Sequence, residues 1–92
     1  MINKDLQKQD LQIYSDACLS YLAADPNELA KFMDFAGYDG KSLKTSIGTN
    51  SFGLALMEYF AKNEPALLAM CANSSIDIDN FMKFWHNQNY YE

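Results

Sequence analysis

The sequence has few of the residues that most often carry catalytic, metal-binding or nucleic-acid chemistry. It contains one histidine, two cysteines and seven basic residues against twelve acidic ones, and every basic residue is a lysine. The formal net charge of -5 opposes binding to a phosphate backbone. Cys18 and Cys71 are far apart and form no CxxC motif, so they fit neither a zinc site nor a disulfide framework. We expect both thiols to be free and buried.

Long apolar runs are also missing. The most apolar stretch, Leu54–Ala72, is interrupted by three charged residues and a proline, so we expect no membrane span. The segment Met1–Asp10 alternates charged and amide residues with scattered apolar ones and lacks the apolar centre of a secretory signal. These features predict a cytoplasmic protein that does not insert into a membrane.

The chain does have abundant apolar residues, 49% of its 92 residues, and they recur along the sequence. When residues 14–47 are placed on residues 52–85, the large apolar positions coincide. The identical pairs are Ala17/Ala55, Tyr21/Tyr59, Ala23/Ala61, Leu29/Leu67 and Asp39/Asp77. Self-similarity at a fixed period marks a repeated supersecondary unit. We therefore expect one domain over residues 1–92, built from two related units that bury their apolar stripes against each other.

Apolar spacing and capping residues predict an all-α fold, a compact bundle of about six short helices. Period-two alternation is missing and β-branched residues are sparse, so no sheet is expected. The expected helices cover residues 6–23, 26–36, 41–47, 51–62, 65–72 and 80–86, three in each unit. Residues 51–62 are apolar nearly all round, which places that helix in the middle of the bundle. The tail, residues 87–92, is expected to fray.

Capping residues fix the boundaries of these helices. Asp25 is the expected N-cap before Pro26, and Glu28 is expected to reach back to the Asp25 amide in a capping box. Gly37 is expected to end that helix in a left-handed conformation. Further N-caps are expected at Asp39, at Thr49 or Asn50, at Asn63, and at Asp77 or Asp79.

Several of these core and capping residues resemble a known family. They are residues 21–26 (Tyr-Leu-Ala-Ala-Asp-Pro), Leu29, Phe32, Ala36-Gly37, Asp39 and Leu43, with Tyr59-Phe60-Ala61 and Ile76-Asp77 in the second half. The pattern, from about Leu11 to Trp85, is similar to a small family found mainly in alphaproteobacteria and catalogued as domain of unknown function 3572. Both turns, at residues 37–40 and 75–78, depart from the Gly-Ile-Asp-Pro-like turn common in that family. The resemblance implies a small helical bacterial protein and brings no activity.

The residues that could carry chemistry are better explained by structural roles. His86 is expected on the surface of the last helix. Residues 77–80 (Asp-Ile-Asp-Asn) resemble the start of a calcium loop, but Phe81 and Met82 follow where further ligands and a glycine are needed. Asp34, Asp39 and Glu58 belong to different helices and form no visible acid–base pair. We predict no catalytic residue, no cofactor and no metal site, and therefore no enzyme.

Other residues bear on possible partners. Residues 29–47 have the outline of a helix-turn-helix, but the would-be recognition helix offers only Lys41 and Lys44 as basic contacts, so nucleic-acid binding is not expected. The methionines share helix faces with leucine and phenylalanine and are assigned to the core. Trp85, Tyr90 and Tyr91 cluster near the C-terminal end, either folded back over the bundle or exposed as contacts for a protein partner.

Three functions follow from these features. The first is a non-enzymatic interaction or oligomerisation module, whose contacts would include Trp85, Tyr90 and Tyr91. The alternative is a small-molecule binder or enzyme with a cleft at the seam between the two units. The third, a helix-turn-helix nucleic-acid binder, has the least support because the chain is acidic.

Overall fold

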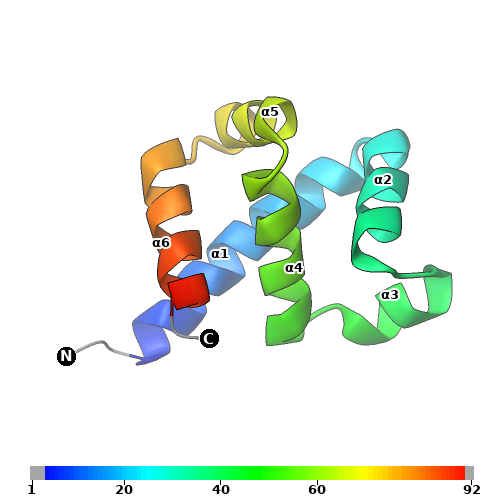
Figure 1. Ribbon diagram of the computed structural model, residues 1–92, viewed down its shortest axis with the longest axis horizontal. Helices are drawn as coiled ribbons and strands as arrows, with labels where there is room; N and C mark the ends of the chain where they lie inside the picture. The colour runs from blue at the N-terminus through cyan, green and yellow to red at the C-terminus, as the bar shows by residue number, and fades with distance from the viewer. Residues whose placement is uncertain (1–3, 91–92) are drawn as a thin grey trace.

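A computed structural model describes the backbone of residues 4–90 and the side chains of residues 9–88. It contains six helices: α1 (Lys4–Ala23), α2 (Pro26–Ala36), α3 (Gly40–Ser46), α4 (Asn50–Ala61), α5 (Glu64–Ser74) and α6 (Ile78–Tyr90) (Figure 1). No strand occurs in residues 4–90. The prediction of an all-α bundle of six short helices is confirmed.

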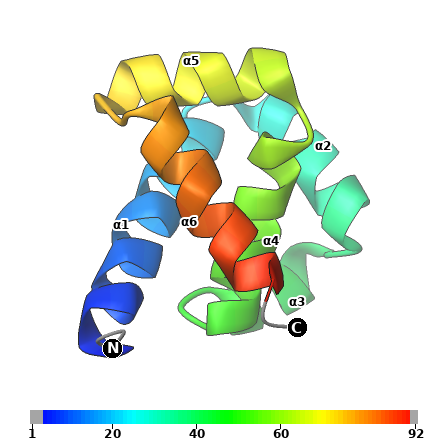
Figure 2. The same cartoon turned by 60° about the vertical axis from the view of Figure 1, so that its left-hand side comes forward.

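The helices α1 and α4 form the centre of the molecule. They pack against each other, and α4 also contacts α2, α5 and α6, as predicted for a helix that is apolar nearly all round. Figure 2 shows α5 across one end of the α1–α4 pair, and α6 in front of this pair. The largest fully buried side chains come from both halves of the chain: Phe32, Phe60, Phe81, Leu22, Leu56, Met57, Met70 and Cys18.

Most predicted caps are present. Asp25 Oδ1 accepts from the Glu28 amide at 3.2 Å, Thr49 Oγ1 accepts from the Phe52 amide, and Gly37 ends α2 with φ 79°. Asp77 Oδ1 accepts from the amides of Asp79 and Asn80 at the start of α6. Local sequence therefore determines where these helices begin and end.

One predicted capping bond does not form, and one correctly predicted N-cap lacks a side-chain bond. Glu28 does not reach back to the Asp25 amide, because its Oε2 accepts a hydrogen bond from Tyr59 Oη of α4 instead. Asn63 occupies the N-cap position of α5 without a side-chain capping bond. The reciprocal capping box forms at α3, where Asp39 Oδ1 accepts from the Ser42 amide and Ser42 Oγ accepts from the Asp39 amide.

The two halves correspond in burial and in backbone conformation. The equivalent pairs Cys18/Leu56, Leu22/Phe60 and Phe32/Met70 are all fully buried. Equivalent residues Gly37 and Ser75 end α2 and α5, both in the left-handed region. The packing corresponds as well, since α2 and its equivalent α5 each contact both α1 and α4.

The third helices of the halves differ. α3 has seven residues and buries none, whereas α6 has thirteen and buries Phe81 completely. Tyr14 of α1 packs its ring against Phe81 and Phe84 of α6, with centroids 5.4 and 5.3 Å apart. The α6 backbone is helical to Tyr90, so it extends into the segment predicted to fray, and residues 91–92 lie outside the described structure.

Within the described residues, no helix is both long enough and apolar enough to cross a lipid bilayer.

Candidate functional site

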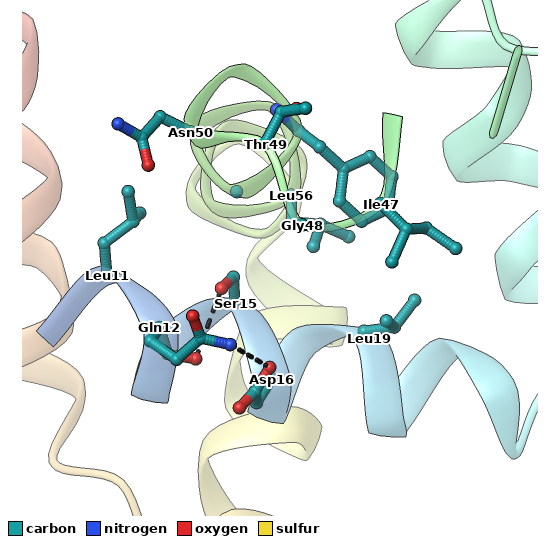
Figure 3. A pocket seen from close by; sticks show the side chains of 12 residues that line it. Leu11, Gln12, Ser15, Asp16, Leu19, Ile47, Gly48, Thr49, Asn50 and Leu56 are labelled. Atoms are coloured by element: carbon teal, nitrogen blue, oxygen red, sulfur yellow. Dashed lines mark hydrogen bonds between the residues drawn. The ribbon is translucent and has the colours of Figure 1, made fainter. Parts of the chain in front are cut away.

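A hollow opens where α1 passes the start of α4, at the seam between the two halves (Figure 3). We call it the seam hollow, and its volume is about 110 Å³. Its walls are Leu11, Gln12, Ser15, Asp16 and Leu19 of α1 and Ile47, Gly48, Thr49, Asn50, Phe52, Gly53 and Leu56 around the start of α4.

The seam hollow combines a buried apolar floor with a partly polar rim. Leu56 is fully buried and Phe52 is 2% exposed, whereas Ile47 at the rim is 48% exposed. In Figure 3, Leu19 rises from α1 below Ile47, so the two side chains flank one opening. An apolar side chain entering here would leave water and contact aliphatic and aromatic atoms.

The rim carries one charged side chain. Asp16 lies on the outer surface of α1, and Gln12 Nε2 donates to its Oδ1 at 3.0 Å (Figure 3). A carboxylate that accepts one hydrogen bond retains further acceptor sites. Ser15 Oγ donates to the Gln12 carbonyl, so its hydroxyl proton is already used within α1. The rim therefore favours a ligand with a positive charge beside its apolar group.

The close approach of α1 and α4 sets the shape of the seam hollow. Gly53 is buried in the first turn of α4, and a Cβ atom there would lie 3.2 Å from Leu11 Cδ1 and 3.4 Å from Ser15 Cβ. Glycine thus lets the two helices approach at this level. The short helix α3 buries no residue, and Ile47 directly after it is 48% exposed at the edge of the seam hollow.

The two thiols are poor nucleophiles. Cys18 is fully buried and Cys71 is 5% exposed, and both are free. Burial raises the pKa of Cys18 well above its usual range, with a further contribution from Cys71. Burial and the Asp77 carboxylate raise the pKa of Cys71. Because the thiolate is the reactive form, these cysteines are core residues, as the sequence predicts.

A long-range polar pair ties α2 to α4. Tyr59, 6% exposed, donates its hydroxyl to Glu28 Oε2. Burial, followed by the hydrogen bond and charge of Glu28, raises the pKa of Tyr59 to about 12. The phenol is therefore protonated at neutral pH and acts as a hydrogen-bond donor that orients α2 on α4.

The aromatic residues proposed from the sequence are only partly described. Trp85 is half-buried, packs against the core and lies with its ring centroid 5.2 Å from that of His86, which is exposed. The side chain of Tyr90 and the whole of Tyr91 lie outside the described residues. A partner-binding role for Trp85, Tyr90 and Tyr91 stays a prediction, and the structure does not bring Trp85 to the seam hollow.

Other sequence candidates have local roles. Asp77 caps α6 through Oδ1, and among residues with described side chains no three His, Cys, Asp or Glu residues gather as metal ligands would. Lys41 and Lys44 are exposed on α3.

The sequence analysis proposed a cleft at the seam between the two units as an alternative, but it assigned to that cleft none of the residues that line the seam hollow. Its lining residues come from two segments whose crossing is a tertiary feature. The only local signals are Gly53 within an otherwise apolar helix and Ile47 beside Gly48, and neither reveals which helix passes nearby.

Comparison with known proteins gives a family without an assigned activity. No curated protein and no solved structure matches the chain significantly. A family model described as "Protein of unknown function (DUF3572)" matches residues 8–88. This range includes α2 to α5, most of α1 and α6, and the whole seam hollow. The chain therefore belongs to the DUF3572 family.

Proposed function

We propose that this protein is a non-enzymatic interaction module of the cytoplasm. Its seam hollow accepts one bulky apolar side chain from a partner protein, and Asp16 pairs with a basic residue beside that side chain. The observation that carries the proposal is a hollow of side-chain size with an apolar floor and a half-exposed isoleucine on its rim.

The size of the seam hollow favours a side chain over a metabolite. Its volume of about 110 Å³ is below the roughly 300–1,000 Å³ of pockets that enclose small-molecule ligands. A cavity of about 150 Å³ accommodates a whole benzene molecule, so the smaller seam hollow takes the end of one leucine or methionine, or part of a phenylalanine ring. Anchoring by a single buried side chain is common in protein interfaces.

Charge favours a basic partner over a second copy of this chain. The net charge of -5 makes two copies repel each other and attracts a cationic surface. Asp16 places a carboxylate beside the apolar opening. A segment that presents an aliphatic or aromatic residue next to lysine or arginine therefore matches both features.

Selection from a random peptide library displayed on phage tests this proposal. Peptides enriched on the immobilised protein should carry one leucine, isoleucine, methionine or phenylalanine beside lysine or arginine. Their affinity should fall as sodium chloride is raised, because the ion pair at Asp16 is exposed to solvent. Failure to enrich such peptides would contradict the proposal.

Two exposed isoleucines provide a matched pair of variants. Ile47→Ser removes the apolar rim and should weaken a selected peptide about tenfold. Ile13→Ser changes an isoleucine of α1 that is 57% exposed and lies outside the seam hollow, so it should leave affinity within about twofold. Equal losses for both variants, or none for Ile47→Ser, would show that the peptide binds elsewhere.

A further inference from the structure

A second and larger hollow lies between the C-terminal ends of α1 and α5. Its volume is about 400 Å³, and its lining residues are Ser20, Tyr21, Ala24, Asp25, Asn73 and Ser74. We call it the C-terminal hollow. It shares no residue with the seam hollow, and it is an open depression, because Ser20, Ala24 and Asn73 in its lining are exposed.

The electrostatics of the C-terminal hollow favour a cation. The last carbonyl groups of a helix lack intrahelical partners and carry a negative partial charge. Two helices end beside this hollow, and neither α1 nor α5 has a basic residue in its last turn. Their dipoles add negative potential that no side chain of either last turn offsets. The positive N-terminus of α2 also lies here, and the carboxylate of its N-cap, Asp25, balances it.

The side chains of the lining reinforce this preference. Asp25 supplies a half-buried carboxylate. Its Oδ1 accepts one capping hydrogen bond, from the Glu28 amide, so the carboxylate retains further acceptor sites. Ser20, Ser74 and Asn73 add hydroxyl and amide oxygens. None of the lining residues is basic.

Tyr21 adds an aromatic wall. It is half-buried, and its ring packs at 78° to that of Phe60 with the centroids 5.8 Å apart. This contact with a fully buried phenylalanine holds the Tyr21 ring in a defined orientation. Aromatic rings attract ammonium and guanidinium groups through their π-systems.

We propose that the C-terminal hollow binds an organic cation, a primary alkylammonium or guanidinium group. The polar oxygens accept hydrogen bonds from its N–H groups, Asp25 balances its charge, and the Tyr21 ring packs against the cationic group and its alkyl part. A single carboxylate in a space of about 400 Å³ suits such a group better than a bare metal ion, which prefers several oxygen ligands at short range. This site is independent of the proposed partner-binding function.

Titration of the ¹⁵N-labelled protein with n-butylammonium chloride and with N-acetyl-lysine methylamide tests the proposal. We expect saturable shifts of the amides of residues 20–25 and 73–75, and none with 1-butanol, which has the same alkyl chain without the charge. Tighter binding of butylammonium would point to a free amine, whereas tighter binding of the lysine derivative would point to a partner's side chain. Shifts that are the same with butanol, or not saturable, would overturn the proposal.

The variant Asp25→Asn removes the negative charge of Asp25 and keeps its role as the N-cap of α2. Asparagine caps helices about as well as aspartate, so α2 should form, and a thermal melt by circular dichroism checks this. The variant should bind the cation about tenfold more weakly, because it loses a charge-assisted hydrogen bond. Asp39→Asn is the matched control, since Asp39 is the N-cap of α3 and does not line the hollow. Unchanged binding by Asp25→Asn, or equal weakening in both variants, would contradict the proposed site.

Discussion

The pair formed by Tyr59 and Glu28 gives the fold a specific weakness at alkaline pH. Burial and the neighbouring carboxylate raise the pKa of Tyr59 from 10.0 to about 12. In the unfolded chain the phenol ionises near pH 10, whereas in the folded protein it keeps its proton. Because the folded pKa is the higher one, the stabilisation present below pH 10 is lost as the pH rises from 10 to 12.

The magnitude follows from the size of this shift. Each pKa unit corresponds to about 1.36 kcal/mol, so raising the pKa from 10.0 to about 12 corresponds to roughly 3 kcal/mol over the whole interval. At pH 11 the unfolded phenol is almost fully ionised, and the free energy of unfolding should be lower by roughly 1 to 2 kcal/mol from this residue alone. Tyr59 is only 6% exposed, so solvent screens the effect little.

Urea unfolding of the wild type and of Tyr59→Phe at pH 8 and pH 11 measures this contribution. Tyr14, Cys18 and Cys71 also have raised pKa values and weaken the fold at high pH, so the comparison uses the difference between the two proteins. At pH 8, Tyr59→Phe should cost about 1–3 kcal/mol, because the Glu28 carboxylate loses its partner.

At pH 11 the difference between the wild type and Tyr59→Phe should shrink by roughly 1 to 2 kcal/mol. The double variant Tyr59→Phe/Glu28→Gln should show the same pH dependence as Tyr59→Phe, because the phenol is already absent. Parallel pH dependences of the wild type and Tyr59→Phe would refute the assignment of the raised pKa to this pair.

Three other predictions address the core, the thiols and a cap. Leu56→Ala should lower the free energy of unfolding by about 3–5 kcal/mol, because it empties a fully buried position on the floor of the seam hollow; a loss below about 1 kcal/mol in urea would contradict this packing. Cys18 and Cys71 should react with Ellman's reagent at pH 8 only as fast as the protein opens, since burial raises both pKa values; rapid reaction of the native protein would contradict their burial. Hydrogen bonds from the Ser42 amide and then from the Ser42 hydroxyl lower the pKa of Asp39. Ser42→Ala keeps the amide and removes the hydroxyl, so the pKa of Asp39 should rise part of the way to its ordinary value in an NMR titration. In the wild type, the stabilisation from this carboxylate should disappear on acidification through the folded pKa.

The sequence predicts those features that depend on neighbouring residues. Asp25, Asp39, Thr49 and Asp77 cap helices through amides two or three positions away, and such bonds need no tertiary contact. Gly37 ends α2 for the same local reason. The central position of α4 also follows from its own residues, because a helix without a polar face must be covered on every side.

Features that depend on contacts between residues far apart in the chain could not be predicted from the sequence. Glu28 has the right spacing for a capping box, but Tyr59, 31 positions away, supplies a competing donor that no local pattern reveals. Gly53 is only a weak helix former in the sequence, and its role at the α1–α4 approach depends on Leu11. The residues that line the seam hollow could not be predicted either, because they come from two separate segments, α1 and the turn before α4 with the start of α4.

The contact between a bound peptide and the seam hollow is the most direct measurement of the proposed function. With a selected peptide bound to the ¹³C-labelled protein, intermolecular nuclear Overhauser effects should connect its apolar anchor to methyl groups of Leu19, Ile47 and Leu56. The same spectra should show no contact between the anchor and Ile13. An anchor that contacts only other surfaces, with the three methyl groups unperturbed, would contradict the proposal that this hollow is the binding site.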